Sequence, residues 1–128
     1  MTIAHIAIFT PDLERLKHFY ITYFNAQANG KYHNSKTNFE SYFLSFDGNS
    51  TKIELMYRKD VIQKEEYSMC FGLNHFAIQV GSRAKVDYLT QLLESDGYRI
   101  ISHPRTTGDG YYESCILDPD GNQVEIVA

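Results

Sequence analysis

The sequence has little cysteine, no excess of positive charge and no long apolar run. Its two cysteines, Cys70 and Cys115, form no CxxC pair, so we interpret them as the reduced thiols of a cytosolic protein. The net charge of −4, without a basic stripe, argues against binding to nucleic acid. No apolar stretch approaches the roughly 20 residues of a membrane helix, and no basic segment precedes the first apolar run. We therefore expect a cytoplasmic protein without a signal peptide and without membrane association.

Three common catalytic signatures are also absent. The sequence contains neither GxxxxGK[ST] nor GxGxxG, which excludes the usual phosphate-binding loops. It contains no GxSxG, the turn that presents the serine of α/β-hydrolases. What remains is an ordinary globular composition, since 43% of the 128 residues are apolar, and this length suits a single domain.

One short pattern occurs twice in this domain. Residues 3–10 (IAHIAIFT) and 73–80 (LNHFAIQV) are apolar runs that alternate like a β-strand, each with histidine in third place. Helix-start signals follow both runs. Thr10 is the expected N-cap of the first helix, with Pro11 as its first residue, and Ser82 is the expected N-cap of the second.

Three extended segments follow each predicted helix. We predict them at 28–33, 39–46 and 51–57 in the first half, and at 98–103, 110–118 and 123–128 in the second. An Asp-Gly-Asn turn precedes the last segment both times. Gly108-Asp109-Gly110 indicates a hairpin connection, with a lid formed by the loop 106–112 as the alternative. The single domain is therefore divided into repeat 1 (1–57), a linker (58–72) and repeat 2 (73–128).

The last strand of each repeat carries one glutamate between apolar neighbours. Glu54 lies 49 residues after His5, and Glu125 lies 50 residues after His75. A carboxylate among apolar residues is costly unless water, a partner or a metal ion compensates its charge. Because the apolar faces of these strands are expected to pack under the helices, the histidines and glutamates should line the opposite faces.

Duplication would then bring two histidines and two glutamates around one approximate two-fold axis. Such a donor set suits Ni²⁺, Zn²⁺, Co²⁺ or Mn²⁺ and leaves positions open for water or substrate. Ala7 and Ala77 share the histidine faces and would leave room above the ion. The alternative is that the histidines are packing residues and the glutamates face water. The matched spacing in two matched patterns favours the metal site.

At these residues the chain resembles the vicinal oxygen chelate superfamily, and within it the small bacterial glyoxalase I-like proteins. The resemblance covers nearly the whole chain and lies in HIAIFTPDLERLKHFY, KIELM, GLNHFAIQV and LDPDGNQVEIV. It implies an α+β fold, in which two βαβββ modules form a cupped eight-stranded mixed sheet with helices on its outer face. It also implies a homodimer, with each site built by one chain or shared between two.

The same resemblance implies a chemistry. His5, Glu54, His75 and Glu125 would hold one divalent ion, Ni²⁺ or Zn²⁺ foremost, with Co²⁺, Mn²⁺ or Fe²⁺ as alternatives. Glyoxalase I-like lyases isomerise a 2-oxoaldehyde–thiol adduct by moving a proton through an enediolate. By similarity, Glu125 is the base and Glu54 a ligand and second acid/base.

Two positions depart from the glutathione-using members. Those proteins tend to carry Arg four residues after the first histidine ligand and Asn four residues after the first glutamate ligand. Phe9 and Arg58 occupy these places here, which weighs against glutathione as the thiol. We regard both as candidate substrate-binding residues for another small carbonyl or thiol adduct. The alternatives are a metal-bearing binding or resistance protein without turnover and an enzyme similar to the CoA-thioester epimerases.

Overall fold

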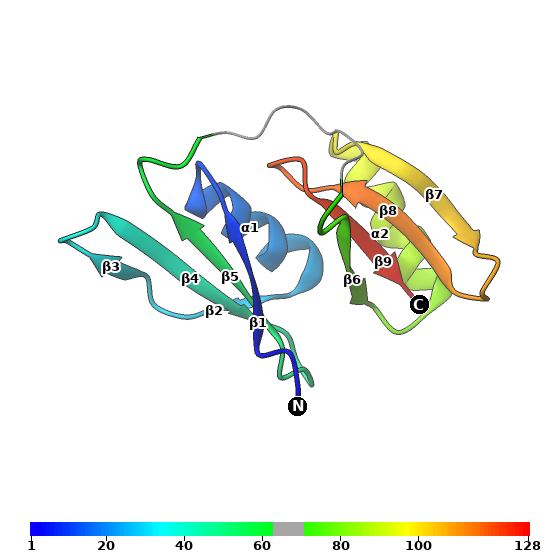
Figure 1. The fold of residues 1–128 in the computed structure, drawn as a ribbon. Helices are drawn as coiled ribbons and strands as arrows, with labels where there is room; N and C mark the ends of the chain where they lie inside the picture. The colour runs from blue at the N-terminus through cyan, green and yellow to red at the C-terminus, as the bar shows by residue number, and fades with distance from the viewer. Residues whose placement is uncertain (63–70) are drawn as a thin grey trace. The chain divides into compact units, whose positions relative to one another are not determined.

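The computed structural model describes residues 1–62 and 71–128 (Figure 1). The chain divides into two compact units, Met1–Lys64 and Glu65–Ala128, which are treated separately below. Cys70 and part of the linker predicted at 58–72 lie outside the described residues. Among the residues that are described, neither helix is long and apolar enough to cross a membrane.

The first unit is one mixed sheet with one helix. Its strand order is β1-β5-β4-β2, and β3 pairs with β4 beyond this path. The first strand runs parallel to the last, and the other pairings are antiparallel. The elements are β1 (His5–Phe9), α1 (Leu13–Phe24), β2 (Gln27–Ala28), β3 (Tyr32–Asn34), β4 (Phe39–Ser45) and β5 (Lys52–Tyr57).

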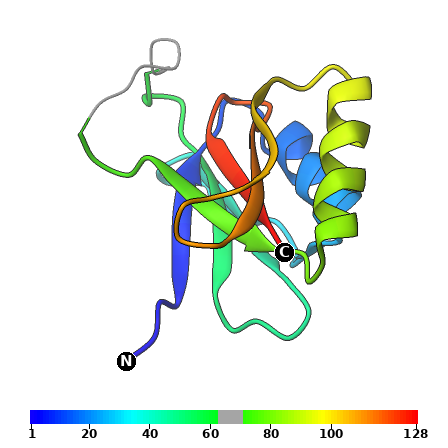
Figure 2. The same ribbon diagram turned by 90° about the vertical axis from the view of Figure 1, so that its right-hand side faces the viewer.

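The second unit repeats this plan with four strands in the order β6-β9-β8-β7. Again the first strand is parallel to the last, and the others are antiparallel. Both views of the ribbon show α2 lying along one face of this sheet (Figures 1 and 2). The elements are β6 (His75–Gln79), α2 (Arg83–Ser95), β7 (Ile100–Thr106), β8 (Tyr112–Leu117) and β9 (Gln123–Val127). The predicted α+β architecture of two βαβββ modules is therefore confirmed.

One of the eight predicted strands is split in two. The segment predicted at 28–33 is divided into β2 and β3, which both pair with β4. The side chain of Asn29 accepts a hydrogen bond from the Phe43 backbone N–H at 2.7 Å. A side-chain oxygen thus takes the place of a strand carbonyl at this point, and regular pairing stops there.

Each helix covers the apolar face of its own sheet. In the first unit the fully buried side chains include Leu16 and Tyr20 of α1 and Leu55 of β5. In the second unit they include Val86 of α2 and Ile126 of β9. Because side chains alternate along a strand, burying this face of β5 and β9 directs their glutamates to the opposite face.

The helix starts differ in how well the sequence predicts them. Ser82 caps α2 as predicted, with Oγ accepting from Lys85 N at 3.3 Å. The prediction of Thr10 as the first N-cap is wrong. Asp12 is the N-cap of α1, its Oδ1 accepting from Arg15 N at 3.0 Å, while Thr10 Oγ1 accepts from Asp12 N at 3.1 Å. A carboxylate two residues further on forms the cap instead, so that Pro11 precedes the helix.

Tight turns lead into the two glutamate-bearing strands. Gly48 and Gly121 adopt φ of 74° and 81°, a region that favours glycine. In the second turn the buried Asp118 carboxylate accepts from the backbone N–H groups of Asp120 and Asn122, both at 2.9 Å. These bonds fix where β9 starts and hence which of its residues face the helix. The connection at 107–111 is a hairpin, closed by Thr107 N donating to Tyr111 O at 2.8 Å.

A charged cluster ties α1 to the sheet of the first unit. Tyr42 on β4 donates to Glu14 Oε1 at 2.8 Å, and Lys31 Nζ lies 3.4 Å from the same atom. Lys17 forms an ion pair with Glu14 and lies 4.2 Å from the centre of the Tyr42 ring. Hydrogen bonds from Lys17 and Tyr42 lower the pKa of Glu14 from 4.5 to about 2.

Glu14→Gln should destabilise the protein at neutral pH and much less in acid. Because the folded-state pKa lies below the ordinary value, the stabilisation is complete above about pH 4.5 and is lost as the pH falls toward about 2. The Glu14 side chain is 56% exposed, so we expect an effect below about 1 kcal/mol at pH 7. Thermal unfolding of both proteins from pH 7 to pH 2.5 measures it. Glu94→Gln, at a 54% exposed position on α2, is the control; a pH-independent difference for Glu14→Gln would contradict the prediction.

Candidate metal centre

The first unit brings His5 and Glu54 together on one face of its sheet. The parallel register of β1 and β5 places Ala7 opposite Glu54. His5 lies two residues before Ala7 and therefore on the same face of the sheet. His5 Nε2 lies 3.7 Å from Glu54 Oε2. The histidine side chain is 45% exposed and the glutamate 15%, so the pair lies at an accessible surface of this unit.

The second unit forms the same pair in the same relative positions. The register of β6 and β9 places Ala77 opposite Glu125, and His75 Nε2 lies 3.1 Å from Glu125 Oε2. The side chains are 40% and 20% exposed. The repetition extends from the sequence spacing to the strand register and to the nitrogen and oxygen atoms that face each other.

Each pair offers a cation one imidazole nitrogen and one carboxylate oxygen. When the histidine is neutral and Nε2 carries no proton, both atoms direct lone pairs to the same space, an arrangement that a divalent cation stabilises. Within either unit, no third His, Cys, Asp or Glu side chain of the described residues joins the pair. Each pair supplies two donors that fit a borderline divalent ion, so four ligands require two such pairs, from one chain or from two. The meeting of His5, Glu54, His75 and Glu125 at one ion stays a prediction.

The surroundings of Glu125 raise the pKa of its carboxyl group, as a proton-transfer role requires. Burial is the largest cause that raises its pKa above the ordinary value, and the negative charge of Glu113 adds to this effect. His75 and Arg105 act in the opposite direction. A carboxylate with a raised pKa holds an abstracted proton more firmly, which favours it as a general base.

The residue paired with each glutamate on the neighbouring antiparallel strand differs between the units. Phe43 lies opposite Glu54 and contacts the His5 ring edge-on, with the ring centres 5.5 Å apart. Cys115 lies opposite Glu125 and is buried. Burial, followed by the charges of Glu125 and Glu113, raises the pKa of the Cys115 thiol to about 11. Glu125 is therefore paired with a protonated thiol on the neighbouring strand, and Glu54 is paired with an aromatic ring.

Phe9 and Arg58, the candidate substrate-binding residues, occupy different surroundings. Phe9 is 44% exposed at the end of β1 and shares a face with His5. Arg58 follows the end of β5 and forms a bidentate ion pair with Asp60, whose Oδ1 accepts from Arg58 Nε at 2.9 Å. The hydrogen bond and the negative charge of Asp60 raise the pKa of Arg58, so this guanidinium stays charged with a carboxylate beside it. Their role in substrate binding stays a prediction.

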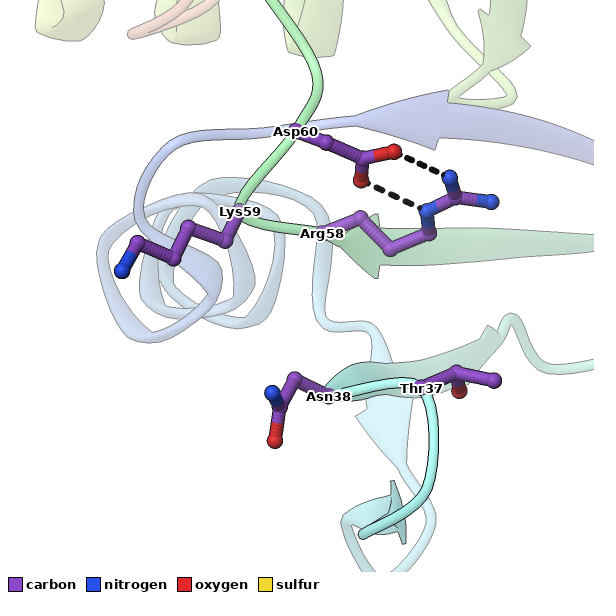
Figure 3. Close-up of a pocket in the computed structure, with 5 residues that line it drawn as sticks. All are labelled: Thr37, Asn38, Arg58, Lys59 and Asp60. Carbon is purple, nitrogen blue, oxygen red and sulfur yellow. Dashed lines mark hydrogen bonds and ion pairs between the residues drawn. The ribbon is translucent and has the colours of Figure 1, made fainter.

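Arg58 lines an open surface pocket of the first unit that does not include the His5–Glu54 pair. Figure 3 shows Arg58 and Asp60 turned toward each other while Lys59 points away from them. The other lining residues, Thr37 and Asn38, come from the turn between β3 and β4.

Sequence reasoning missed one polar contact of the second pair. The Nδ1 atom of His75 lies 2.8 Å from Asn74 Oδ1, the side chain of the preceding residue. A third histidine–glutamate contact, His103 to Glu94 at 3.7 Å, lies away from these strands with both side chains more than half exposed. Proximity alone therefore does not distinguish the two pairs; their place on parallel first and last strands does.

Two βαβββ modules that each carry a histidine on the first strand and a glutamate on the last define a class of glyoxalase-like proteins. Residues 2–126 match the family model of the Glyoxalase/Bleomycin resistance protein/Dioxygenase superfamily. The chain belongs to this superfamily, the vicinal oxygen chelate proteins that its sequence resembles.

Similar proteins agree with this assignment. The uncharacterized protein YqjT of Bacillus subtilis (strain 168) is 30% identical over 97% of this chain and 96% of its own length. Glyoxalase I of Zea mays has a TM-score of 0.78 and 26% identity over 98% of this chain, which spans 43% of the maize chain. A glyoxylase/bleomycin resistance protein/dioxygenase domain from Frankia sp. EAN1pec shares the fold, with a TM-score of 0.82 at 16% identity over 99% of this chain and 96% of that domain.

The Cys115 thiol should react slowly in the folded protein. Raising its pKa from 9.0 to about 11 lowers the thiolate fraction at pH 8 about a hundredfold, and the thiolate is the nucleophile. We expect alkylation by iodoacetamide at pH 8 to be at least about a hundredfold slower in folded Cys70→Ser protein than in the same protein unfolded in urea. Equal rates in the two states would contradict the burial and the raised pKa.

Proposed function

We propose that this protein is a metal-dependent, glyoxalase I-like isomerase of the lyase type. Its substrate would be the adduct of a small 2-oxoaldehyde with a thiol, or a related small carbonyl compound. His5, Glu54, His75 and Glu125 would hold one divalent ion, within one chain or between two. The observation that carries this proposal is the matched histidine–glutamate pair on the parallel first and last strands of both units.

The donor atoms favour particular ions. Two imidazole nitrogens and two carboxylate oxygens suit Ni²⁺ or Zn²⁺, with Co²⁺, Mn²⁺ or Fe²⁺ as alternatives. Four protein ligands leave positions open to substrate oxygens when the ion is six-coordinate. Bound there, the cation would polarise adjacent substrate oxygens and stabilise the negative charge that develops on them.

The chain's own groups would move the proton. Glu125 would take it from the carbon next to the polarised carbonyl, since its pKa is raised by burial. The same carboxyl would return the proton to the neighbouring carbon, which completes an isomerisation without a change in oxidation state overall. Glu54 would act as a ligand and a second acid/base. Ala7 and Ala77, opposite the two glutamates in the register, place only methyl groups beside the reacting atoms.

Phe9 and Arg58 bear on which thiol the substrate carries. Position 9 offers an aromatic ring where glutathione-using relatives tend to have a guanidinium, and the charge of Arg58 is balanced by Asp60. Neither residue then provides a free cation for the carboxylates of glutathione. We therefore propose a smaller or less acidic thiol as the preferred partner.

Glu125→Gln should reduce turnover more strongly than it reduces metal affinity. We expect purified wild-type protein with Ni²⁺ or Zn²⁺ to isomerise methylglyoxal hemithioacetals, and Glu125→Gln to lose at least about a hundredfold in kcat because the base is removed. His75→Ala should weaken metal binding at least about tenfold. Absorbance assays with a panel of thiols and metal titration by calorimetry measure the two effects.

His103→Ala is the matched control for these variants. Its histidine lies 3.7 Å from a glutamate, the same distance as in the His5–Glu54 pair, but away from the proposed centre. It should retain wild-type metal affinity and turnover. Binding of an oxoaldehyde adduct without turnover with any thiol or metal would instead favour a binding or resistance protein. Absence of metal binding would refute the proposed centre.

We further propose that the protein is a homodimer, as the resemblance implies. Light scattering after gel filtration should give twice the chain mass of 14.8 kDa. The expected mass should persist on dilution to low micromolar concentration, because permanent dimers of this kind bury large apolar interfaces. A species of the chain mass throughout this range would contradict the proposal.

A further inference from the structure

The two histidines of the proposed centre differ in what contacts their second ring nitrogen. For His75, both ring nitrogens have an oxygen within hydrogen-bonding distance. Asn74 Oδ1 lies 2.8 Å from Nδ1, and Glu125 Oε2 lies 3.1 Å from Nε2. Neutral imidazole carries one proton, so only one of these nitrogens donates, and the other presents a lone pair.

The backbone carbonyl of Asn74 is held by a series of hydrogen bonds that continues into the sheet. Gln123, opposite His75 in the register and 8% exposed, donates from Nε2 to the backbone carbonyl of Asn74 at 3.4 Å. The buried Cys115 thiol donates to Gln123 Oε1 at 3.7 Å. The network therefore fixes the backbone at the residue that precedes His75.

In the first unit the carbonyl of the residue before the histidine is also held, because Ala4 O accepts from Lys52 N at 3.1 Å. The two units differ in the side chains around their histidines. Ala4 precedes His5 and has no side-chain acceptor. Lys52 is opposite His5 where Gln123 is opposite His75, and Phe43 is opposite Glu54 where Cys115 is opposite Glu125. The ring of His5 is contacted by the edge-on aromatic ring of Phe43 instead. The His75–Glu125 pair thus has hydrogen-bonding neighbours, and the His5–Glu54 pair has an aromatic neighbour.

We propose that Asn74 is the positioning residue of the second half-site. When a cation lies between Nε2 and Glu125, Asn74 Oδ1 accepts the Nδ1–H of His75 and so holds the ring with its Nε2 lone pair directed to the ion. In the metal-free protein the ionised Glu125 carboxylate competes with Asn74 for the ring proton, because a carboxylate is the stronger acceptor. Resting on the proposed metal function, the Asn74 contact makes the His75–Glu125 pair the more constrained half of the centre, while His5 has no such constraint from its neighbour. Hydrogen bonds to the second nitrogen of ligating histidines commonly set the tautomer and contribute to metal affinity.

The tautomer of His75 is measured directly by nitrogen NMR of metal-free Glu125→Ala protein, in which the competing carboxylate at Nε2 is absent. Histidines labelled with ¹⁵N at the ring are observed at pH 8, where ordinary imidazoles are neutral. His75→Gln assigns the resonance by its loss. In the Glu125→Ala background we expect His75 to be protonated at Nδ1, and the further change Asn74→Ala to shift it toward the Nε2–H form. Asn74→Asp retains an acceptor oxygen and should preserve the Nδ1–H form. The His5 resonances should be the same in all these proteins and serve as the internal control.

Metal titration provides the second readout. We expect Asn74→Ala to weaken Zn²⁺ or Ni²⁺ binding about 10–100-fold and Asn74→Asp to recover most of the loss. Unchanged circular dichroism and melting temperature would show that the fold is retained. Ala4→Ser, a polar change at the equivalent position of the first unit, should leave the His75 tautomer unchanged.

The outcomes separate this inference from the proposed function. His75 protonated at Nε2 in the metal-free Glu125→Ala protein, or an affinity of otherwise wild-type protein for metal that Asn74→Ala leaves unchanged, overturns the role of Asn74 even when the enzyme is active. The Nδ1–H form that Asn74→Ala abolishes supports that role without any activity measurement. A protein that binds no metal but shows this tautomer change refutes the metal function and the affinity effect, while it supports the hydrogen bond itself.

Discussion

The parallel pairing of the first and last strands is the constraint on which the rest of each unit depends. It brings residues about fifty positions apart in the chain side by side and fixes their register. The helix then covers one face of that sheet, so the side chains on the opposite face remain accessible. Since side chains alternate with a period of two, a slip of one residue in β5 or β9 would bury a glutamate and expose an apolar residue. The apolar core therefore selects the register that turns the glutamate toward the histidine.

Local features determine where this register begins. The turns at Gly48 and Gly121 use left-handed backbone conformations, and in the second unit Asp118 adds side-chain bonds to two backbone N–H groups. A start of β9 that is fixed so tightly leaves little freedom for Glu125, four residues after Gly121. The geometry of the turn at Gly121 therefore determines where the Glu125 carboxylate lies.

The sequence is sufficient to predict the features that repeat or alternate. The twofold pattern, the exposed faces of β5 and β9 and the cap at Ser82 all follow from periodicity and local chemistry. Features that depend on one unrepeated side chain are not predictable in this way. Asn29 interrupts a strand through a contact with Phe43, and Asp12 replaces Thr10 as a cap although both residue types are suitable. The Asn74–His75 contact is another such case, because an asparagine before a strand is ordinarily assigned to a turn.

The two units share one backbone plan, but the side chains next to their histidine–glutamate pairs differ. His5 contacts the Phe43 ring edge-on, with the ring centres 5.5 Å apart. His75 has the Asn74 amide oxygen 2.8 Å from its Nδ1, a contact that we propose orients its ring. A carboxylate raised in pKa by burial lies beside this second histidine, in the unit that the polar network stabilises. In the proposed mechanism the base and the oriented ligand would thus lie in the same unit, with Glu125 as the base and Glu54 as a ligand and second acid/base.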